Sequence, residues 1–400
     1  MKQKVKDFFQ VILSQKKYIV ALYILLALFA SIQPLLSGTK TFEDDESRRQ
    51  YIRYNNYIIF KSSFHHLNDG KDLYTPHPDD HWDLYKYTPT FAALFAPFAI
   101  FPDWVGLNLW NLLNALVFAL AIYRLPIFSN TKKGLILIIC MIELMTSMQN
   151  QQSNGLMAAL IILTFGMLEK NRYLLATLCV VLSAYIKLFS VVGMVLFLFY
   201  PKKWKLALYS VMWALVLFAV PLLFVSVEQY NFLIHSYLNM LSNDHVTSYG
   251  YSVMGWLYSW FGIDSGKGVV VILGAIALLV PLYKIKCYAN QTFRILMLAS
   301  ILIWVVIFNH KAESPTFIIA MAGVALWFMV SKKDILNITL FVCAFVFVSL
   351  SPTDIFPRYV KVHLVVPYCL KAVPCIFIWF KIMFNLITFP RQTNQTVSTC

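Results

Sequence analysis

Long apolar segments separated by short polar connectors recur along most of the 400-residue chain. About 20 apolar residues in a helix cross the ~30 Å hydrocarbon core of a bilayer. That core offers no water to the backbone, so only helices and closed barrels span it. The alternating segments that a barrel needs are too few here. The pattern therefore predicts an all-α polytopic membrane protein, with 1–400 as a single integral membrane domain.

The apolar segments predict about twelve membrane-spanning helices, the first of them over 18–36. The segment 173–200 contains Lys187, and the sequence leaves open whether it forms one span or two. If it forms one span, every later connector lies on the opposite side of the membrane. Taken as two, the spans after the first are expected at 104–123, 134–148, 153–168, 173–186, 188–200, 206–225, 267–283, 294–309, 315–330, 335–350 and 359–384.

The polar interval 37–103 holds most of the acidic and histidine residues outside the short connectors. Within it, Tyr57, Phe60, Phe64 and Leu67 have the spacing of one helix face, which predicts an amphipathic helix over 51–67 on the outer membrane surface. A helix that only packs on the surface is the alternative. The segment 88–101 reaches only ~21 Å as a helix, too short for a span. It contains two prolines, and we expect a second interfacial helix there.

The formal net charge of +14 arises mainly from Lys and Arg in the short connectors. Basic connectors face the cytoplasm, so this charge indicates membrane topology rather than nucleic-acid binding. With 88–101 kept on the outer side, the connector with Arg124, Lys132 and Lys133 lies inside together with the later basic connectors. We therefore expect a multi-pass protein of a bacterial-type plasma (inner) membrane, with both termini and the tail 391–400 in the cytoplasm.

Cysteine and histidine spacing indicates no metal or disulfide framework. The seven cysteines show no CxxC pattern, and His235 and 243–245 match no metal-ligand template. No metal and no cofactor are expected.

Several motifs in the first half of the chain follow one another in a recognisable order. An acidic segment and the amphipathic helix lead to Gly-x-Asp-Leu-Tyr, then to a Tyr-x-Pro-x-Phe segment and a Leu-Trp-Asn-Leu-Leu-Asn span. In this order and spacing, the chain resembles glycosyltransferase family 87, polyprenol-phosphate-sugar-dependent enzymes of the GT-C architecture. The matching residues are Gly70–Tyr74, Tyr87–Phe91, Leu94, Pro97, Pro102, Leu109–Asn114, Gln151–Gly155 and Ala184–Leu188.

The resemblance implies a GT-C-like helical bundle whose general base is an outward-facing Asp at the start of the amphipathic helix. In this chain that position is Asn56, and an amide cannot take a proton from an acceptor hydroxyl. Asp44 and Asp45, beside Glu46, are the first candidates to replace it. The second candidates are Asp79, Asp80 and Asp83, although any one of these carboxylates can equally be a solvated loop charge.

A leaving phosphate needs cations or hydrogen-bond donors. Lys187 is the strongest candidate because a lysine within an apolar stretch is costly, although snorkelling at a helix end is the alternative. His310, Lys311 and Glu313 form a second outward cluster. The amides on the same side complete the candidate substrate-binding set: Asn55, Asn56, Gln151 and Asn154.

Taken together, the residues and the resemblance predict an inverting hexosyltransferase. It would pass a mannose-like hexose from a polyprenyl-phosphate donor to a lipid-linked or cell-envelope glycan acceptor at the outward membrane face. A transporter or flippase of lipid-linked precursors is the main alternative, but it predicts internal repeats and midplane charges, and the sequence shows no repeat. A catalytically silent homologue is the third possibility, because of Asn56.

Overall fold

The computed structural model describes residues 12–43, 48–243, 248–264 and 266–390. It is 74% helical. The only sheet among the described residues is an antiparallel hairpin of β1 (Thr39–Glu43) and β2 (Arg48–Ile52), with Thr39 opposite Ile52. The prediction of an almost entirely helical protein is confirmed, whereas the count of twelve spans stays a prediction.

Within the described residues, three helical segments are long and apolar enough to cross a membrane. They are α2 (Lys16–Leu36), α6 (Asp103–Arg124), and α10 (Lys203–Ala219) continued by η2 (Val220–Leu223). Large apolar side chains on them are exposed, among them Leu25 at 64% and Leu215 at 65%. Exposed apolar surface of this extent is unfavourable in water but favourable in contact with lipid. These helices therefore indicate a membrane protein.

Shorter apolar helices lie in the rest of the described chain. They are α8 (Asn154–Glu169), α9 (Tyr173–Ile186), the 3-10 helix η1 (Leu188–Phe199), α13 (Lys267–Leu279) with η3 (Val280–Tyr283), α14 (Gln291–Ile307), η5 (Ser314–Thr316) with α15 (Phe317–Val330), α16 (Ile335–Ala344) with η6 (Phe345–Leu350), and α18 (Val373–Ile387). The other helices are α7 (Asn130–Gln149), α11 (Val227–Asn243), α12 (Val253–Phe261), η4 (Ile285–Cys287), α17 (Arg358–Val360) and η7 (Lys361–Val365).

One expected helix is broken in the structure. The segment 359–384 forms short helical pieces up to Val365, then irregular turns, and α18 starts only at Val373. Pro367 has no N–H to donate to a helix, and Cys369 has a left-handed φ of 51°. A single helix over 359–384 is therefore the wrong description.

The chain packs as two compact units, each described here by itself. The first comprises Met1–Gly193, Trp204–Ser248 and Glu313–Ile319, and the second Met194–Lys203, Tyr249–Ala312 and Ala320–Cys400. In the first unit, α6 packs against α2 and α8, and α8 packs against α9. In the second unit, α14 packs against α18.

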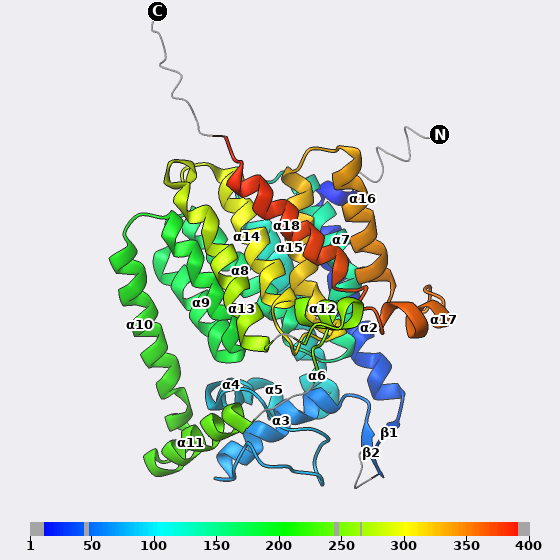
Figure 1. The fold of residues 1–400 in the computed structure, drawn as a ribbon. Coiled ribbons are helices and arrows are strands. Elements are labelled where there is room, and N and C mark those ends of the chain that lie inside the picture. Colours follow the sequence, from blue (N-terminus) through cyan, green and yellow to red (C-terminus); the bar gives the residue numbers. More distant parts are fainter. Residues whose placement is uncertain (1–11, 44–47, 244–247, 265, 391–400) are drawn as a thin grey trace, which may run out of the picture. The chain divides into compact units, whose positions relative to one another are not determined.

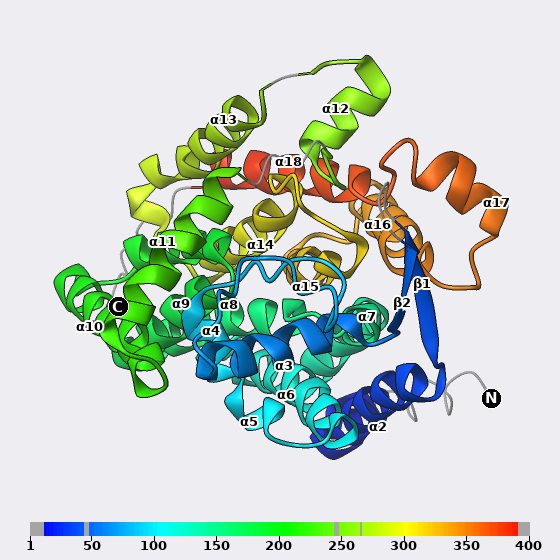
Figure 2. The ribbon, with the colours of Figure 1, turned by 90° about the horizontal axis from the view of Figure 1, so that it is seen from below.

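The polar interval forms a helical platform within the first unit. It comprises α3 (Asn55–Asn68), α4 (Pro89–Leu94) and α5 (Ala96–Ala99), with α3 packed on the other two. Figure 1 shows these helices and α11 at one end of α8 and α9, and Figure 2 shows α3 beside α4 and α5. The expected helix 51–67 begins later, since Tyr51 and Ile52 belong to β2. The expected helix 88–101 is two short helices.

Aromatic packing fixes the platform to the span that follows it. The ring of Phe60 on α3 lies 5.3 Å from Phe91, 5.5 Å from Phe95 and 6.0 Å from Trp110 of α6, in edge-to-face contacts. Such contacts add about 0.5–1.5 kcal/mol each beyond burial. At Gly106 a Cβ atom would lie 2.2 Å from the Phe98 carbonyl oxygen, so only glycine lets α6 approach α5 this closely.

Candidate functional site

The helix break at Lys187 is the local feature from which the candidate site is built. α9 ends at Ile186, Lys187 is extended with φ −140° and ψ 115°, and η1 starts at Leu188. A 3-10 helix rises about 2.0 Å per residue, so the 12 residues of η1 reach ~24 Å. The sequence contains both apolar segments, but only the structure shows that the chain bends at the lysine between them.

Four residues from three segments of the first unit form what we call the Lys187 cluster: Lys187, Tyr87, Gln152 and Asn154. The Lys187 ammonium donates to Asn154 Oδ1 at 2.8 Å and to Gln152 Oε1 at 3.4 Å, and it lies 5.6 Å from the centroid of the Tyr87 ring. No carboxylate lies within 4.0 Å of it among the described residues. The lysine therefore keeps its charge available to an anion.

Burial lowers the pKa of Lys187 to about 8, and the negative charge of Glu313 opposes that shift. The side chain is nevertheless partly exposed. At neutral pH the ammonium form still predominates, and a bound phosphate would stabilise it further. The cluster thus combines a reachable cation with weak, neutral partners.

Both ends of the Asn154 side-chain amide make hydrogen bonds, and the turn before it is fixed through its backbone. Its Nδ2 donates to the Pro315 carbonyl oxygen at 3.0 Å, which leaves Oδ1 for the lysine. The turn before α8 is fixed by the Trp110 indole N–H, which donates to the Gln151 carbonyl oxygen at 2.9 Å. Gln151 itself is buried with a left-handed φ of 50°. Its role is therefore to shape the turn, and its side chain folds back on the Gln149 carbonyl.

Two carboxylates act electrostatically on this cluster. Burial raises the pKa of Tyr87 well above its ordinary value, and the negative charges of Glu313 and Asp83 raise it further. Asp83 has a left-handed φ of 73°, accepts from its neighbour's N–H, and pairs with Lys86 at 2.9 Å. Glu313 is exposed, and its N–H donates to Thr316 Oγ1 at 3.3 Å where η5 begins.

The remaining acidic candidates have different surroundings. Asp80 lies 2.8 Å from His66 Nε2, and Asp79 is 98% exposed and 3.4 Å from Arg49. Asp44 and Asp45 lie outside the described residues. Among the described carboxylates predicted as the base, Asp83 is the one whose charge acts on the pKa of Tyr87 in the Lys187 cluster.

The two asparagines of α3 hold neighbouring segments together. Asn55 is buried and makes two bonds with the Trp82 backbone, donating to its carbonyl at 2.8 Å and accepting from its N–H at 3.0 Å. Asn56 Nδ2 donates to the Asn150 carbonyl oxygen at 2.9 Å. An aspartate at position 56 has no hydrogen to donate, so the amide at the expected base position has a structural contact of its own.

His310 and Lys311 belong to the second unit. There the Tyr251 N–H donates to the Ala312 carbonyl at 2.9 Å, and the Lys311 N–H donates to Asn309 Oδ1 at 3.0 Å. Their assignment to the donor phosphate stays a prediction.

Two groups of residues were missed in the sequence. Tyr87 lies in the Tyr-x-Pro segment and Gln152 beside Gln151, so both were within a motif but not singled out. His66, His77 and Asp80 form what we call the histidine cluster, with one ligand atom from each within 4.8 Å of the others. Their spacing along the chain matches no metal template, so no sequence pattern indicated them.

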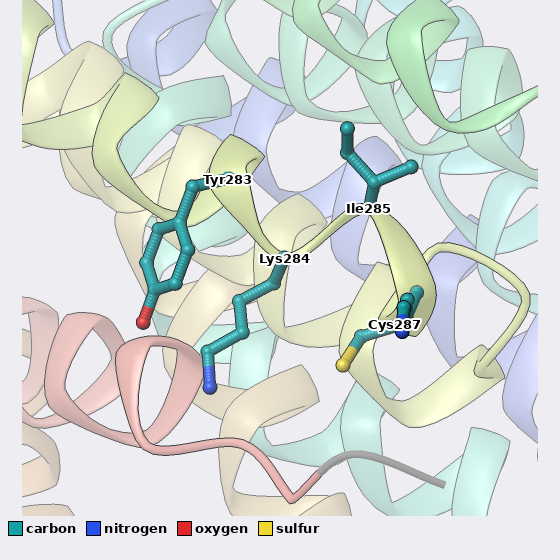
Figure 3. Close-up of a pocket in the computed structure, with 5 residues that line it drawn as sticks. Tyr283, Lys284, Ile285 and Cys287 are labelled. Atoms are coloured by element: carbon teal, nitrogen blue, oxygen red, sulfur yellow. The ribbon is translucent and has the colours of Figure 1, made fainter.

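The second unit contains a small cavity of about 240 Å³, and two of the polar residues that line it bind backbone carbonyls (Figure 3). The Tyr283 hydroxyl donates to the Ile387 carbonyl at 2.9 Å, and the Lys284 ammonium to the Phe389 carbonyl at 3.1 Å. The first of these bonds satisfies the last carbonyl of α18 and the second a carbonyl two residues beyond its end, which is a structural role.

Comparison with known families gives one match. The model of glycosyltransferase family 87 matches residues 85–309, which include Tyr87, Gln152, Asn154 and Lys187. No curated protein matches the chain.

Proposed function

Because the chain belongs to glycosyltransferase family 87, we propose that this membrane glycosyltransferase transfers a mannose-like hexose from a polyprenyl phosphate to a lipid-linked or cell-envelope glycan. The reaction takes place at the outward membrane face. The observation that carries this proposal is the Lys187 cluster, in which a lysine between two apolar helices has no carboxylate within 4.0 Å in the part of the chain that the structure describes.

A lysine in this position suits a lipid-linked phosphate. The two apolar helices beside it, α9 and η1, can pack against an isoprenoid chain. The ammonium can then bind the phosphate at the end of that chain. Asn154 and Gln152 hold the ammonium in place through neutral oxygens, which a phosphate oxygen can join or replace. A nucleotide donor, by contrast, would need further polar contacts for its base and ribose.

The chemistry follows from the charges. The acceptor hydroxyl gives its proton to a carboxylate as its oxygen attacks the anomeric carbon. The bond from that carbon to the phosphate oxygen breaks with inversion, and the phosphate leaves with one more negative charge. Lys187 stabilises that charge where it develops.

We propose Asp83 as the base among the described carboxylates, because its charge reaches Tyr87 of the cluster. Asp44 and Asp45 are the remaining candidates. Asp79 and Asp80 are the weakest of the five, since Asp79 is almost fully exposed beside Arg49 and Asp80 is bound to His66. His310, Lys311 and Glu313 are proposed to assist donor binding, and Asn56 and Asn55 to shape the acceptor side.

The topology that accompanies this proposal is multi-pass, in a plasma membrane, with both termini cytoplasmic. Single cysteines at positions 187 and 309, in a variant without native cysteines, should react with an impermeant maleimide added from outside. Reaction only after membrane permeabilisation would contradict the proposed orientation.

The function is tested with the purified protein in nanodiscs, labelled donors and a cell-envelope lipid extract. We expect labelled product from a polyprenyl-phosphate hexose and none from the matching nucleotide-diphosphate hexose. Product from the nucleotide sugar alone contradicts the proposed donor. No product from any donor favours a silent homologue, or a flippase if labelled lipid crosses the bilayer in proteoliposomes.

A further inference from the structure

The histidine cluster joins the end of α3 to the loop that follows it. His66 lies in the last turn of α3, and His77 and Asp80 lie 11 and 14 residues further along. His66 Nε2 is 2.8 Å from Asp80 Oδ2, and the rings of His66 and His77 are 3.9 Å apart at their centroids. One ligand atom from each residue lies within 4.8 Å of the other two.

The hydrogen bonds of these rings set their tautomers. His77 Nε2 lies 2.8 Å from the Asp72 carbonyl oxygen. A carbonyl only accepts, so this nitrogen carries the hydrogen and Nδ1 keeps its lone pair. A ring N–H fixed on a backbone carbonyl is the arrangement that orients metal-binding histidines. His77 is thus already held as a ligand rather than as a donor.

A third histidine lies beside the cluster. The ring of His81 is buried 6.1 Å from that of His77, and its Nδ1 donates to the Asp83 carbonyl at 2.9 Å. Metal ions bind the neutral form of imidazole. His66, His77 and Asp80 thus offer two imidazole nitrogens and one carboxylate oxygen, a mixed nitrogen and oxygen ligand set.

We propose that His66, His77 and Asp80 bind a zinc ion, with water as the fourth ligand. Imidazole nitrogen and carboxylate oxygen are both zinc ligands, and zinc sites with three protein ligands leave one position to water. Bonds of about 2.0–2.1 Å place tetrahedral ligand atoms roughly 3.3 Å apart. The widest pair must therefore close by at most roughly 1.5 Å. Asp80, with its side chain 48% exposed, gives the ion a path from solvent.

Metal binding here replaces one hydrogen bond. His66 Nε2 now donates its hydrogen to the Asp80 carboxylate, and in the zinc form the neutral ring carries that hydrogen on Nδ1 instead. Both atoms of the present bond then bind zinc, with no net loss of a proton. The ion would fasten the loop 69–83, and with it Asp83, to the end of α3. It would also remove Asp80 from the candidates for the base.

The test uses the full-length protein, purified in nanodiscs and stripped with a chelator. Zinc chloride is titrated by calorimetry, bound zinc is counted after gel filtration, and cobalt(II) is used as a spectroscopic substitute. We expect one zinc per chain and a cobalt absorption band typical of four nitrogen and oxygen ligands. Thermal unfolding should move to higher temperature with zinc.

Variants on α3 and the loop give the control. His77→Gln and Asp80→Asn should each weaken zinc binding by at least about 10-fold. His65→Gln, the exposed neighbour of His66 on the same helix, should bind as the wild type does. His77 and Asp80 are not fully buried, so both variants are expected to fold, which circular dichroism checks. Absence of stoichiometric zinc, or binding that both variants leave unchanged, overturns the proposal. None of these measurements depends on whether the protein transfers sugar.

Discussion

The Lys187 cluster and the histidine cluster are both polar and both belong to the first unit, but their fold contexts differ. Lys187 lies where two apolar helices meet, and its partners are neutral amides from another helix end. The histidines lie between α3 and an irregular loop, and they hold one another and a carboxylate. The first arrangement leaves a cation able to receive an anion, and the second leaves lone pairs able to receive a cation.

Asp83 belongs to neither cluster, but it interacts with a neighbour of one and a member of the other. Its backbone carbonyl accepts from His81 beside the histidine cluster, and its side-chain charge acts on Tyr87 of the Lys187 cluster. Charge and tautomer, rather than polarity alone, therefore decide which ligand each cluster takes. If the two clusters work separately, substitutions in one should leave the ligand of the other unaffected.

The largest effect is expected at Asp83. Asp83→Asn keeps the backbone contact to His81 but removes the proposed base, so kcat/KM for sugar transfer should fall about 10²–10⁴-fold. Asp79→Asn, at a 98% exposed side chain four residues earlier, is the matched control and should leave transfer unchanged. Full activity of Asp83→Asn would move the base to Asp44 or Asp45.

Removing the cation should have the next largest effect. Lys187→Ala is expected to lower kcat/KM about 10²–10³-fold, because the leaving phosphate loses its charged partner. Zinc binding should not change. Lys205→Ala, at an exposed lysine of α10, serves as the control. If both variants lose activity equally, a general loss of positive charge rather than a phosphate site is responsible.

A smaller effect is expected at Asn154. Asn154→Ala leaves the buried Pro315 carbonyl without its donor and Lys187 without its nearest acceptor. An unsatisfied buried group costs about 1–3 kcal/mol, so the midpoint of thermal unfolding should fall by several degrees. Scanning calorimetry in nanodiscs measures it. An unchanged midpoint would show that water replaces the amide.

The smallest effect on transfer is expected from His77→Gln. This change should weaken zinc binding while the dependence of transfer on Lys187 stays as in the wild type. The measurement is kcat/KM for His77→Gln and for the double variant with Lys187→Ala. Separate clusters predict that the two effects multiply. A measurable loss in His77→Gln alone that is absent when the change is made in the Lys187→Ala background would show that the clusters act as one site.

The sequence indicated Lys187 because a charge inside a long apolar stretch is costly, and that reasoning needs no tertiary contacts. It also located most apolar helices, since their length and composition are local properties. It did not indicate the hairpin of β1 and β2, whose ten residues alternate only weakly. It also missed the break at Pro367 and Cys369, where a left-handed residue ends the helix.

The candidate site was harder to predict from the sequence, because its contacts join residues that are far apart in the chain. The partners of Lys187 lie 33 and 35 residues earlier in the chain, and their pairing depends on how α8 and α9 pack. The histidine cluster depends on the path of an irregular loop, for which no periodic pattern exists. Asn56 illustrates the same limit, because its bond to Asn150 spans 94 residues.

The central claim is that the Lys187 ammonium binds the donor phosphate, and the pH dependence of transfer tests it most directly. Since burial lowers the pKa of this lysine to about 8, kcat/KM should fall as pH rises through 8 and the ammonium loses its proton. Lys187→Arg stays charged at that pH, so its profile should lose this alkaline limb while part of the activity remains. An alkaline limb at the same pH in Lys187→Arg would contradict the account.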